Sequence, residues 1–258
     1  MKITFIGTAG GAMVTESRSS PSILINNDLL LDCGEGCTQK LLQLKTIDTI
    51  NTICITHFHI DHYWGLFPLL IHYLFSNRTA DLTIIGPPQT KATIGKIFAI
   101  LGGEVDSGKL NFNINFKELT DRDGVQEIKG DYTLKCAKMD HAIISFAYRV
   151  EKNNQSVCYS GDTRPTQQLV KLAENCNVFI CESTLPDHHL KLADKHGHST
   201  ISDTVKMARD ANCQKLVLTH LLSFFAKNMI KSKDKLKEIF NKEILFADDL
   251  LTLEIDDT

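Results

Sequence analysis

Three histidines and an aspartate follow a short apolar stretch within residues 53–62, Ile-Cys-Ile-Thr-His-Phe-His-Ile-Asp-His. The first four of these residues are apolar or β-branched and predict a buried strand. Because side chains two apart in a strand point the same way, His57 and His59 can face one point in space. Asp61 and His62 follow where a helix is expected to begin, so they can face a neighbouring point. Imidazole and carboxylate bind zinc and similar divalent metals, and the pattern predicts a metal site.

A structural role is the alternative for any one of these residues. A single histidine beside a strand is more often a surface residue or a hydrogen-bonded core residue than a metal ligand. Here four such groups follow one predicted strand within a few residues. So many polar groups at the end of a buried strand need a shared partner, because burying them unpaired costs free energy. We therefore favour metal binding.

The composition of the chain limits what can surround this site. The chain has 258 residues, 43% of them hydrophobic, which is enough to bury a sizeable core. Its formal net charge of −3 argues against large nonspecific affinity for nucleic acid. No apolar run is long enough to span a bilayer, and residues 1–7 resemble the start of a strand rather than a signal peptide. Eight cysteines without Cys-x-x-Cys spacing predict free buried thiols and a reducing, cytoplasmic location.

Predicted strands and helices alternate through both halves of the chain. The predicted strands, including a hairpin at 22–32, lie at residues 2–6, 22–32, 53–56, 82–86, 110–116, 157–159, 177–182 and 215–218; two or three more lie between residues 125 and 151, and a final strand lies in the C-terminal tail. The predicted helices lie at residues 37–45, 62–76, 90–101, 166–175 and about 227–240, and a further helix is expected directly after residues 197–200. This alternation predicts a parallel or mixed sheet covered by helices. No linker or low-complexity segment interrupts it, so residues 1–258 are expected to form one domain.

Polar residues stand where several predicted strands end, at Asp32, His57, Asp162, Glu182 and His220. In α/β folds this edge of the sheet is where binding sites are built. A carboxylate at the first of these strand ends can accept a hydrogen bond from a metal-bound histidine, but it can equally be an ordinary turn residue. A histidine between two strands, as at position 141, is on its own more often structural.

The candidate ligands at residues 57–62, together with those at positions 141, 162 and 220, are too many for one zinc ion. They suit two ions that share one carboxylate, with Mn²⁺ or Fe²⁺ as the alternatives to Zn²⁺. Two close metals can bind a hydroxide, hold a phosphoryl or carbonyl oxygen and stabilise the developing charge. A metal also lowers the pKa of bound water to near neutrality, so no Ser or Cys nucleophile is needed. The seven candidate ligands are His57, His59, Asp61, His62, His141, Asp162 and His220.

The sequence resembles the metallo-β-lactamase superfamily over nearly its whole length. Residues 57–62 match the superfamily's His-x-His-x-Asp-His signature, and the later ligand motifs are matched at His141, Asp162 and His220. Asp32 matches the superfamily's first, structural aspartate. The resemblance implies an αββα sandwich of two pseudo-symmetric halves, a symmetry that the repeated strand-Thr-His at positions 56–57 and 219–220 would fit. It also implies one zinc on His57, His59 and His141, another on Asp61, His62 and His220, and Asp162 as the bridge.

Within the superfamily the chain looks most like the ribonuclease Z branch. The similar segments are Gly7-Thr8 with Arg18 and Ser22, and residues 31–36, 160–165, 197–200 and 218–220. The resemblance implies hydrolysis of phosphodiesters, with tRNA 3′ ends as the best-known substrate, and a homodimer. It gives His198 the protonation of the leaving oxygen and Asp61 the orientation or deprotonation of water. Protonation of an alkoxide is the step that metals assist least; without the resemblance, His198 would be taken for a helix N-terminal residue.

Several departures from this branch weaken the assignment to tRNA. A long basic arm usually separates the ligands that match His141 and Asp162, but here only about 20 residues lie between them. The family's Pro-x-Lys-x-Arg-Asn loop is degraded at residues 14–19, its His-Glu-Ala-Thr motif is altered at residues 181–184, and its Ser-Arg-Tyr is absent after His220. The lysines of the last predicted helix are interleaved with acids, which indicates a solvated face.

These observations predict a dinuclear zinc hydrolase that attacks phosphodiesters with a metal-bound hydroxide; its partner is a phosphodiester, with RNA as one candidate and a small phosphodiester as another. The first rival keeps the metals but acts on a thioester, lactone or sulfate ester. A β-lactamase proper is disfavoured because the bridging position is Asp162 rather than Cys, and a flavodiiron protein because His59 is not Glu. The second rival, a non-catalytic binding protein, is disfavoured because no ligand is missing. The roles of Glu182 and Arg18 stay open.

Overall fold

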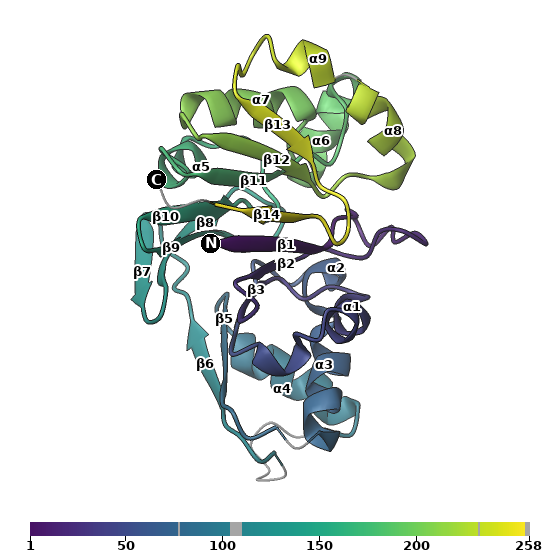
Figure 1. Cartoon of the computed structure of the whole chain (residues 1–258), viewed down its shortest axis with the longest axis vertical. Coiled ribbons are helices and arrows are strands. Elements are labelled where there is room, and N and C mark those ends of the chain that lie inside the picture. Colours follow the sequence, from purple (N-terminus) through teal and green to yellow (C-terminus); the bar gives the residue numbers. More distant parts are fainter. Residues whose placement is uncertain (77, 104–109, 232, 256–258) are drawn as a thin grey trace.

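The computed structural model describes residues 1–76, 78–103, 110–231 and 233–255. Within these ranges the strands form two seven-stranded sheets that lie face to face. Helices from the first half of the chain cover the outer face of one sheet, and helices from the second half cover the other (Figure 1). This is the αββα sandwich that the sequence predicts.

The first sheet has the strand order β14-β1-β2-β3-β4-β5-β6. Its strands are β1 (Lys2–Gly7), β2 (Ser22–Ile25), β3 (Leu29–Leu31), β4 (Thr52–Cys54), β5 (Leu82–Gly86), β6 (Ile114–Glu118) and β14 (Thr252–Glu254). Pairing is antiparallel from β14 to β3 and parallel from β3 to β6. The last strand of the chain therefore joins the sheet of the first half.

The second sheet has the order β13-β12-β11-β10-β9-β8-β7. Its strands are β7 (Val125–Lys129), β8 (Thr133–Met139), β9 (Ser145–Lys152), β10 (Gln155–Tyr159), β11 (Val178–Glu182), β12 (Lys215–Thr219) and β13 (Glu243–Phe246). Pairing is antiparallel from β7 to β10 and parallel from β10 to β13. Strands β10 and β11 are buried along their whole length, which explains their nearly continuous apolar sequences.

Three apolar clusters hold the four layers together. One lies between the sheets and includes Phe5, Tyr148 and Ile180. The second joins the first sheet to its helices, and the third joins the second sheet to its own. The helices are α1 (Cys37–Gln43), α2 (Ile60–Tyr63), α3 (Leu66–Phe75) and α4 (Thr90–Ile100) on the first sheet, and α5 (Gln167–Leu172), α6 (Leu190–His196), α7 (Ile201–Asp210), α8 (Ser223–Lys231) and α9 (Lys233–Leu236) on the second, with short 3₁₀ turns at Ile47–Thr49 and Asp187–His189.

The predicted helix at 62–76 is wrong in one respect, because the chain breaks it into α2 and α3. Gly65 stands at the break, where a Cβ atom would lie 1.9 Å from the carbonyl oxygen of Gly34. Only glycine allows this close approach. Of the two aromatic residues around this break, Trp64 is 37% exposed, whereas Phe67 is buried.

Two other predicted elements have different boundaries. The strand expected at 110–116 begins at Ile114, and residues 104–109 before it lie outside the described ranges. The helix expected at 227–240 is two helices, α8 and α9, that begin earlier and end at Leu236. The side chains of three of its five lysines, at positions 227, 231 and 233, are not described. No helix in the described part of the chain is long and apolar enough to cross a membrane.

Candidate metal centre

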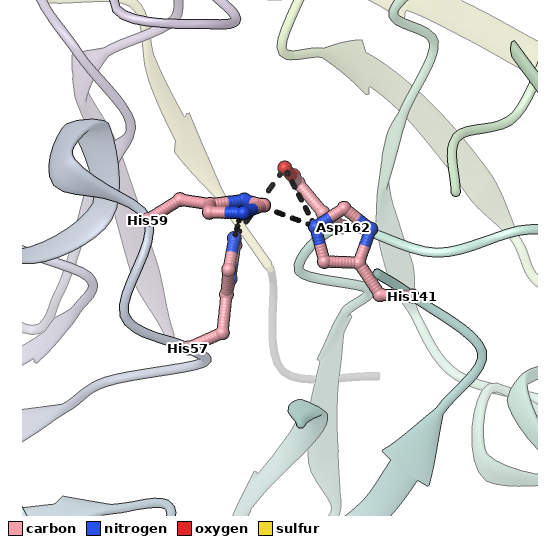
Figure 2. A group of neighbouring side chains, drawn as sticks. All are labelled: His57, His59, His141 and Asp162. Carbon is pink, nitrogen blue, oxygen red and sulfur yellow. Dashed lines mark hydrogen bonds and ion pairs between the residues drawn. The ribbon is translucent and has the colours of Figure 1, made fainter. Parts of the chain in front are cut away.

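The first group of candidate ligands comes from three strand ends. His57 and His59 follow β4, His141 follows β8 and Asp162 follows β10, and the side chains converge from opposite sides (Figure 2). Nε2 of His57 and Nε2 of His141 lie 3.0 Å and 3.1 Å from Nδ1 of His59. The Oδ2 atom of Asp162 lies 3.6 Å from Nε2 of His57 and 3.9 Å from Nε2 of His141. One atom from each residue can therefore reach a single metal ion.

The second group lies on the other side of the same carboxylate. Nε2 of His62 and Nε2 of His220 are 3.3 Å apart, and Oδ2 of Asp61 lies 3.4 Å from the His220 nitrogen. The two oxygens of Asp162 reach both histidines, at 3.3 Å from His62 and 3.4 Å from His220. The structure thus brings all seven predicted residues together, in the two groups that the resemblance implies, with Asp162 between them.

Four of the histidines are held by a hydrogen bond at the ring nitrogen that faces away from the cluster. Nδ1 of His62 lies 2.7 Å from Oδ2 of Asp32, and Nδ1 of His141 lies 2.7 Å from the carbonyl oxygen of Gly197. Threonine hydroxyls lie 2.9 Å from Nδ1 of His57 and 2.8 Å from Nδ1 of His220. Such contacts fix the tautomer and leave Nε2 free for a metal. Asp32 is therefore a hydrogen-bond partner of the site rather than a simple turn residue.

The protonation states of most groups in this cluster also suit a metal; the exception is His62, where burial is outweighed by Asp162 and Asp61, which raise its pKa well above the usual value. Burial, reinforced by His62, holds the pKa of His57 well below its usual value, and burial also lowers the pKa values of His59 and His141. Burial opposes ionisation of Asp162, but the nearby imidazoles of His220 and His62 outweigh it and hold its pKa well below the usual range. Neutral imidazoles and ionised carboxylates are the forms that bind divalent metals.

One atom shows that the donor set is incomplete by itself. Asp162 is almost fully buried, yet its Oδ1 atom has no hydrogen-bond partner among the described residues. A buried carboxylate oxygen without a partner is costly unless a cation neutralises it. Nitrogen and oxygen ligands in groups of three and four are the donor set that zinc and related divalent ions prefer. The residues present therefore fit two such ions.

Glu182 and His198 form a pair beside the cluster. Glu182 is fully buried and accepts hydrogen bonds from the backbone N–H groups of Thr163 and Ser199, and its Oε1 lies 3.0 Å from Nδ1 of His198. Burial alone would lower the pKa of His198, but the Glu182 carboxylate outweighs it and raises this pKa to about 9. The imidazolium ring lies next to the rings of His141 and His220, so it can give a proton to a group bound there.

The loop after β1 contributes a contact that the sequence did not predict. The backbone N–H of Ala12 donates to Oδ2 of Asp61 at 3.2 Å, and Ala12 adopts a positive φ of 55° to do so. Arg18 fixes the far end of this loop, because it donates to the Thr8 hydroxyl and pairs with Asp248. In the described structure Arg18 contacts none of the seven candidate ligands. In the sequence Arg18 precedes a turn-rich segment, and nothing at that position indicated that it fixes the loop after β1.

The comparison with known families identifies the fold. Residues 27–221 match the family model of the beta-lactamase superfamily domain. The chain belongs to the metallo-β-lactamase superfamily. A curated relative in Picrophilus torridus, named ribonuclease Z, is 30% identical, and the alignment covers 99% of this chain and 96% of the relative. The predicted ribonuclease Z-like branch of the superfamily is thereby confirmed.

Solved structures show the same fold. The crystal structure of the short form of human tRNase Z aligns over 100% of both chains with a TM-score of 0.80 and 24% identity. A metallo-β-lactamase-fold protein from Bacillus subtilis aligns over 98% of this chain and 99% of its own, with a TM-score of 0.81 and 20% identity. The superfamily fold and the ribonuclease Z-like sequence therefore agree with the geometry of the candidate metal centre.

Proposed function

We propose that this protein is a dinuclear zinc-dependent hydrolase of phosphodiester bonds, with RNA as the class of substrate. The observation that carries the proposal is Asp162, a buried carboxylate between the two groups of ligands, with one oxygen that accepts no hydrogen bond from the described residues. The relatives named ribonuclease Z support the choice of substrate. Processing of tRNA 3′ ends is the narrower form of the proposal.

The chain's own residues would hold the two metals in distinct ways. His57, His59 and His141 would bind one ion, and Asp61, His62 and His220 the other, with Asp162 shared. Zinc is the proposed ion, with Mn²⁺ or Fe²⁺ as alternatives. When bound, the ions would polarise the phosphoryl oxygens and lower the pKa of water at the site.

Two residues move protons in the proposed reaction. Asp61 is held by the N–H of Ala12 and is ionised, since burial is outweighed by His62 and His220, which lower its pKa. It orients the attacking water or accepts its proton. His198, charged through Glu182, gives its proton to the leaving oxygen. The two proton transfers are thus separated between a carboxylate and an imidazolium.

The proposal extends to the organisation of the molecule. We propose one domain over residues 1–258 without a long RNA-binding arm, because the chain between His141 and Asp162 contains only β9, a two-residue turn at Asn153-Asn154 and β10. Eight buried free cysteines support a reducing, cytoplasmic location. A homodimer is proposed from the family alone.

The test uses the zinc-loaded protein, bis(p-nitrophenyl) phosphate and a precursor tRNA with a 3′ trailer. We expect cleavage of the small diester, and the His198→Ala variant to slow trailer removal more than release of nitrophenolate, a good leaving group that needs little protonation. Cleavage of bis(p-nitrophenyl) phosphate alone would support phosphodiesterase activity and contradict the processing of tRNA 3′ ends. If neither substrate is cleaved while elemental analysis finds two metals per chain, the proposal is wrong and a thioester, lactone or sulfate ester becomes the substrate to test.

A further inference from the structure

A cavity of about 340 Å³ opens beside His198, outside the metal-ligand cluster. Its size falls in the range of small-molecule pockets, which is about 300–1,000 Å³. The residues that line it come from the loop after β10, from α6 and from the start of α7: Pro165, Leu190, Lys191, Asp194, His198 and Asp203. None of them except His198 has a place in the proposed reaction.

His198 connects this cavity to the cluster. Its ring packs beside His141 and His220, and its Nδ1 atom is occupied by Glu182. Nε2 makes no hydrogen bond within the described structure and is the nitrogen left to meet the leaving oxygen. The rest of the leaving group, which is attached to that oxygen, must extend past the imidazole ring of His198. The cavity that this ring lines is therefore placed to receive it.

The lining of the cavity indicates what it would bind. Leu190 is 54% exposed and, with Pro165, presents an apolar surface. Of the two acids, Asp194 pairs with Arg164, and Asp203 accepts hydrogen bonds from Thr200. Lys191 has no ion-pair partner in the described part of the chain. The apolar surface of Leu190 and Pro165, beside the ammonium group of Lys191, suits a flat, partly apolar group that is one part of an anionic substrate.

A second cavity, of about 320 Å³, lies beside His141, and its lining has the same charged groups, two aspartates and one lysine. Asp123 and Asp140 line it, and its one lysine, Lys138, pairs with Asp121. This lysine is therefore already paired, and the lining has no counterpart of Pro165 and the exposed Leu190, since its Met139 is buried. The cavity beside His198 is the better match for a part of the substrate.

We propose that this cavity, with Leu190 as its main contact, binds the leaving group of the phosphodiester and selects one the size of a nucleoside. This inference rests on the proposed function. In the step concerned, a water oxygen bonds to phosphorus and gives a proton to Asp61. The bond from phosphorus to the leaving oxygen breaks, and His198 protonates that oxygen. The products are a phosphomonoester and an alcohol, and the alcohol lies in the cavity.

The test is a diester that can be cut in two ways, thymidine 3′-(methyl phosphate). Cleavage of one bond releases thymidine and methyl phosphate, and cleavage of the other releases methanol and thymidine 3′-phosphate. The ratio of thymidine to thymidine 3′-phosphate, measured by chromatography, reports which arm occupies the leaving-group side. It does not depend on enzyme concentration or metal loading. We expect the zinc-loaded protein to release mainly thymidine.

Leu190→Asp should lower this ratio roughly tenfold, as expected for loss of an apolar contact in a pocket. Leu190→Ala should lower it less. The matched control is Leu192→Asp, since Leu192 is 41% exposed on the same helix but does not line the cavity. An unchanged ratio in both Leu190 variants, with cleavage retained, overturns the inference alone. No cleavage of this diester or of bis(p-nitrophenyl) phosphate overturns the proposed function and the inference with it.

Discussion

The two halves of the molecule share one pattern of strand pairing and use it differently. Each sheet has four strands in antiparallel succession followed by three parallel additions. By this pattern β3 corresponds to β10, β4 to β11 and β5 to β12. The repeated Thr-His follows β4 and β12, which do not correspond. The repeat that the sequence shows is therefore not the structural repeat.

Corresponding strand ends carry an aspartate with opposite surroundings. Asp32, after β3, accepts hydrogen bonds from the backbone and hydroxyl of Thr56 and from the hydroxyl of Tyr159, and contacts His62. Asp162, after β10, keeps one oxygen without a partner among the described residues. A fully hydrogen-bonded carboxylate stabilises the fold, whereas a carboxylate left short of partners is available to a metal. The same architecture thus supplies a structural and a chemical aspartate.

The threonines of the next strand ends are alike. Thr56 lies two residues beyond β4 and its hydroxyl contacts Nδ1 of His57. Thr184 lies two residues beyond β11 and its hydroxyl contacts Nδ1 of His220. Each half therefore orients one imidazole with a threonine at a corresponding position. The threonines that orient the ligands therefore occupy corresponding positions in the two halves, whereas the ligands themselves do not.

The largest expected effect is from Asp162→Ala. Loss of the shared carboxylate should remove at least one metal and reduce kcat/KM for bis(p-nitrophenyl) phosphate by on the order of a thousandfold, since metal stabilisation of the transition state is worth several kcal/mol. Metal content by elemental analysis and turnover check this together. Full metal content with normal turnover would contradict the role of Asp162 as a metal ligand.

Asp32→Ala should act on stability instead. It leaves the hydroxyls of Thr56 and Tyr159 and the Nδ1 of His62 buried without their acceptor, which we expect to cost about 3 kcal/mol of unfolding free energy. Urea denaturation of the chelator-treated protein measures this, with Asp162→Ala as the matched variant. If both variants lose the same stability without metal, the distinction between the two aspartates fails.

Glu182→Gln should change the pH dependence of activity. The His198 imidazolium, with a pKa of about 9, is present below that pH and is lost as the pH rises through it. Without the Glu182 carboxylate this pKa falls, so activity on an alkyl-ester substrate should decline from a lower pH. We expect the rate above neutrality to drop by about ten- to a hundredfold. A descending limb that stays in place would mean that Glu182 does not control His198.

The smallest effects should come from Thr56→Val and Thr184→Val. Removal of a hydrogen bond behind a metal-binding histidine typically reduces metal affinity by about ten- to a hundredfold. We expect the lower end of this range and similar values for both, because the two threonines occupy corresponding places. Competition for zinc with a chromogenic chelator measures the affinity. A change in only one variant would show that the two halves support their ligands unequally.

The contiguous part of the metal centre can be predicted from local sequence alone. The four polar side chains of residues 57–62 adjoin along the chain, so local geometry places them together whatever the rest of the fold does. Strand and helix periodicity likewise predicted most elements of the sandwich. It failed at Gly65, where the chain turns between α2 and α3 and lies so close to Gly34 that only glycine fits.

The meeting of distant strand ends depends on the complete three-dimensional fold. His141, Asp162, Glu182, His198 and His220 follow different strands or loops, and their approach depends on strand order and register, which no local pattern encodes. The family resemblance assigned most of them, but it did not give the Glu182–His198 contact, the Ala12 N–H on Asp61 or the cavity beside Leu190. These arise where segments far apart in the chain pack together, because packing in three dimensions sets which groups are within hydrogen-bond distance.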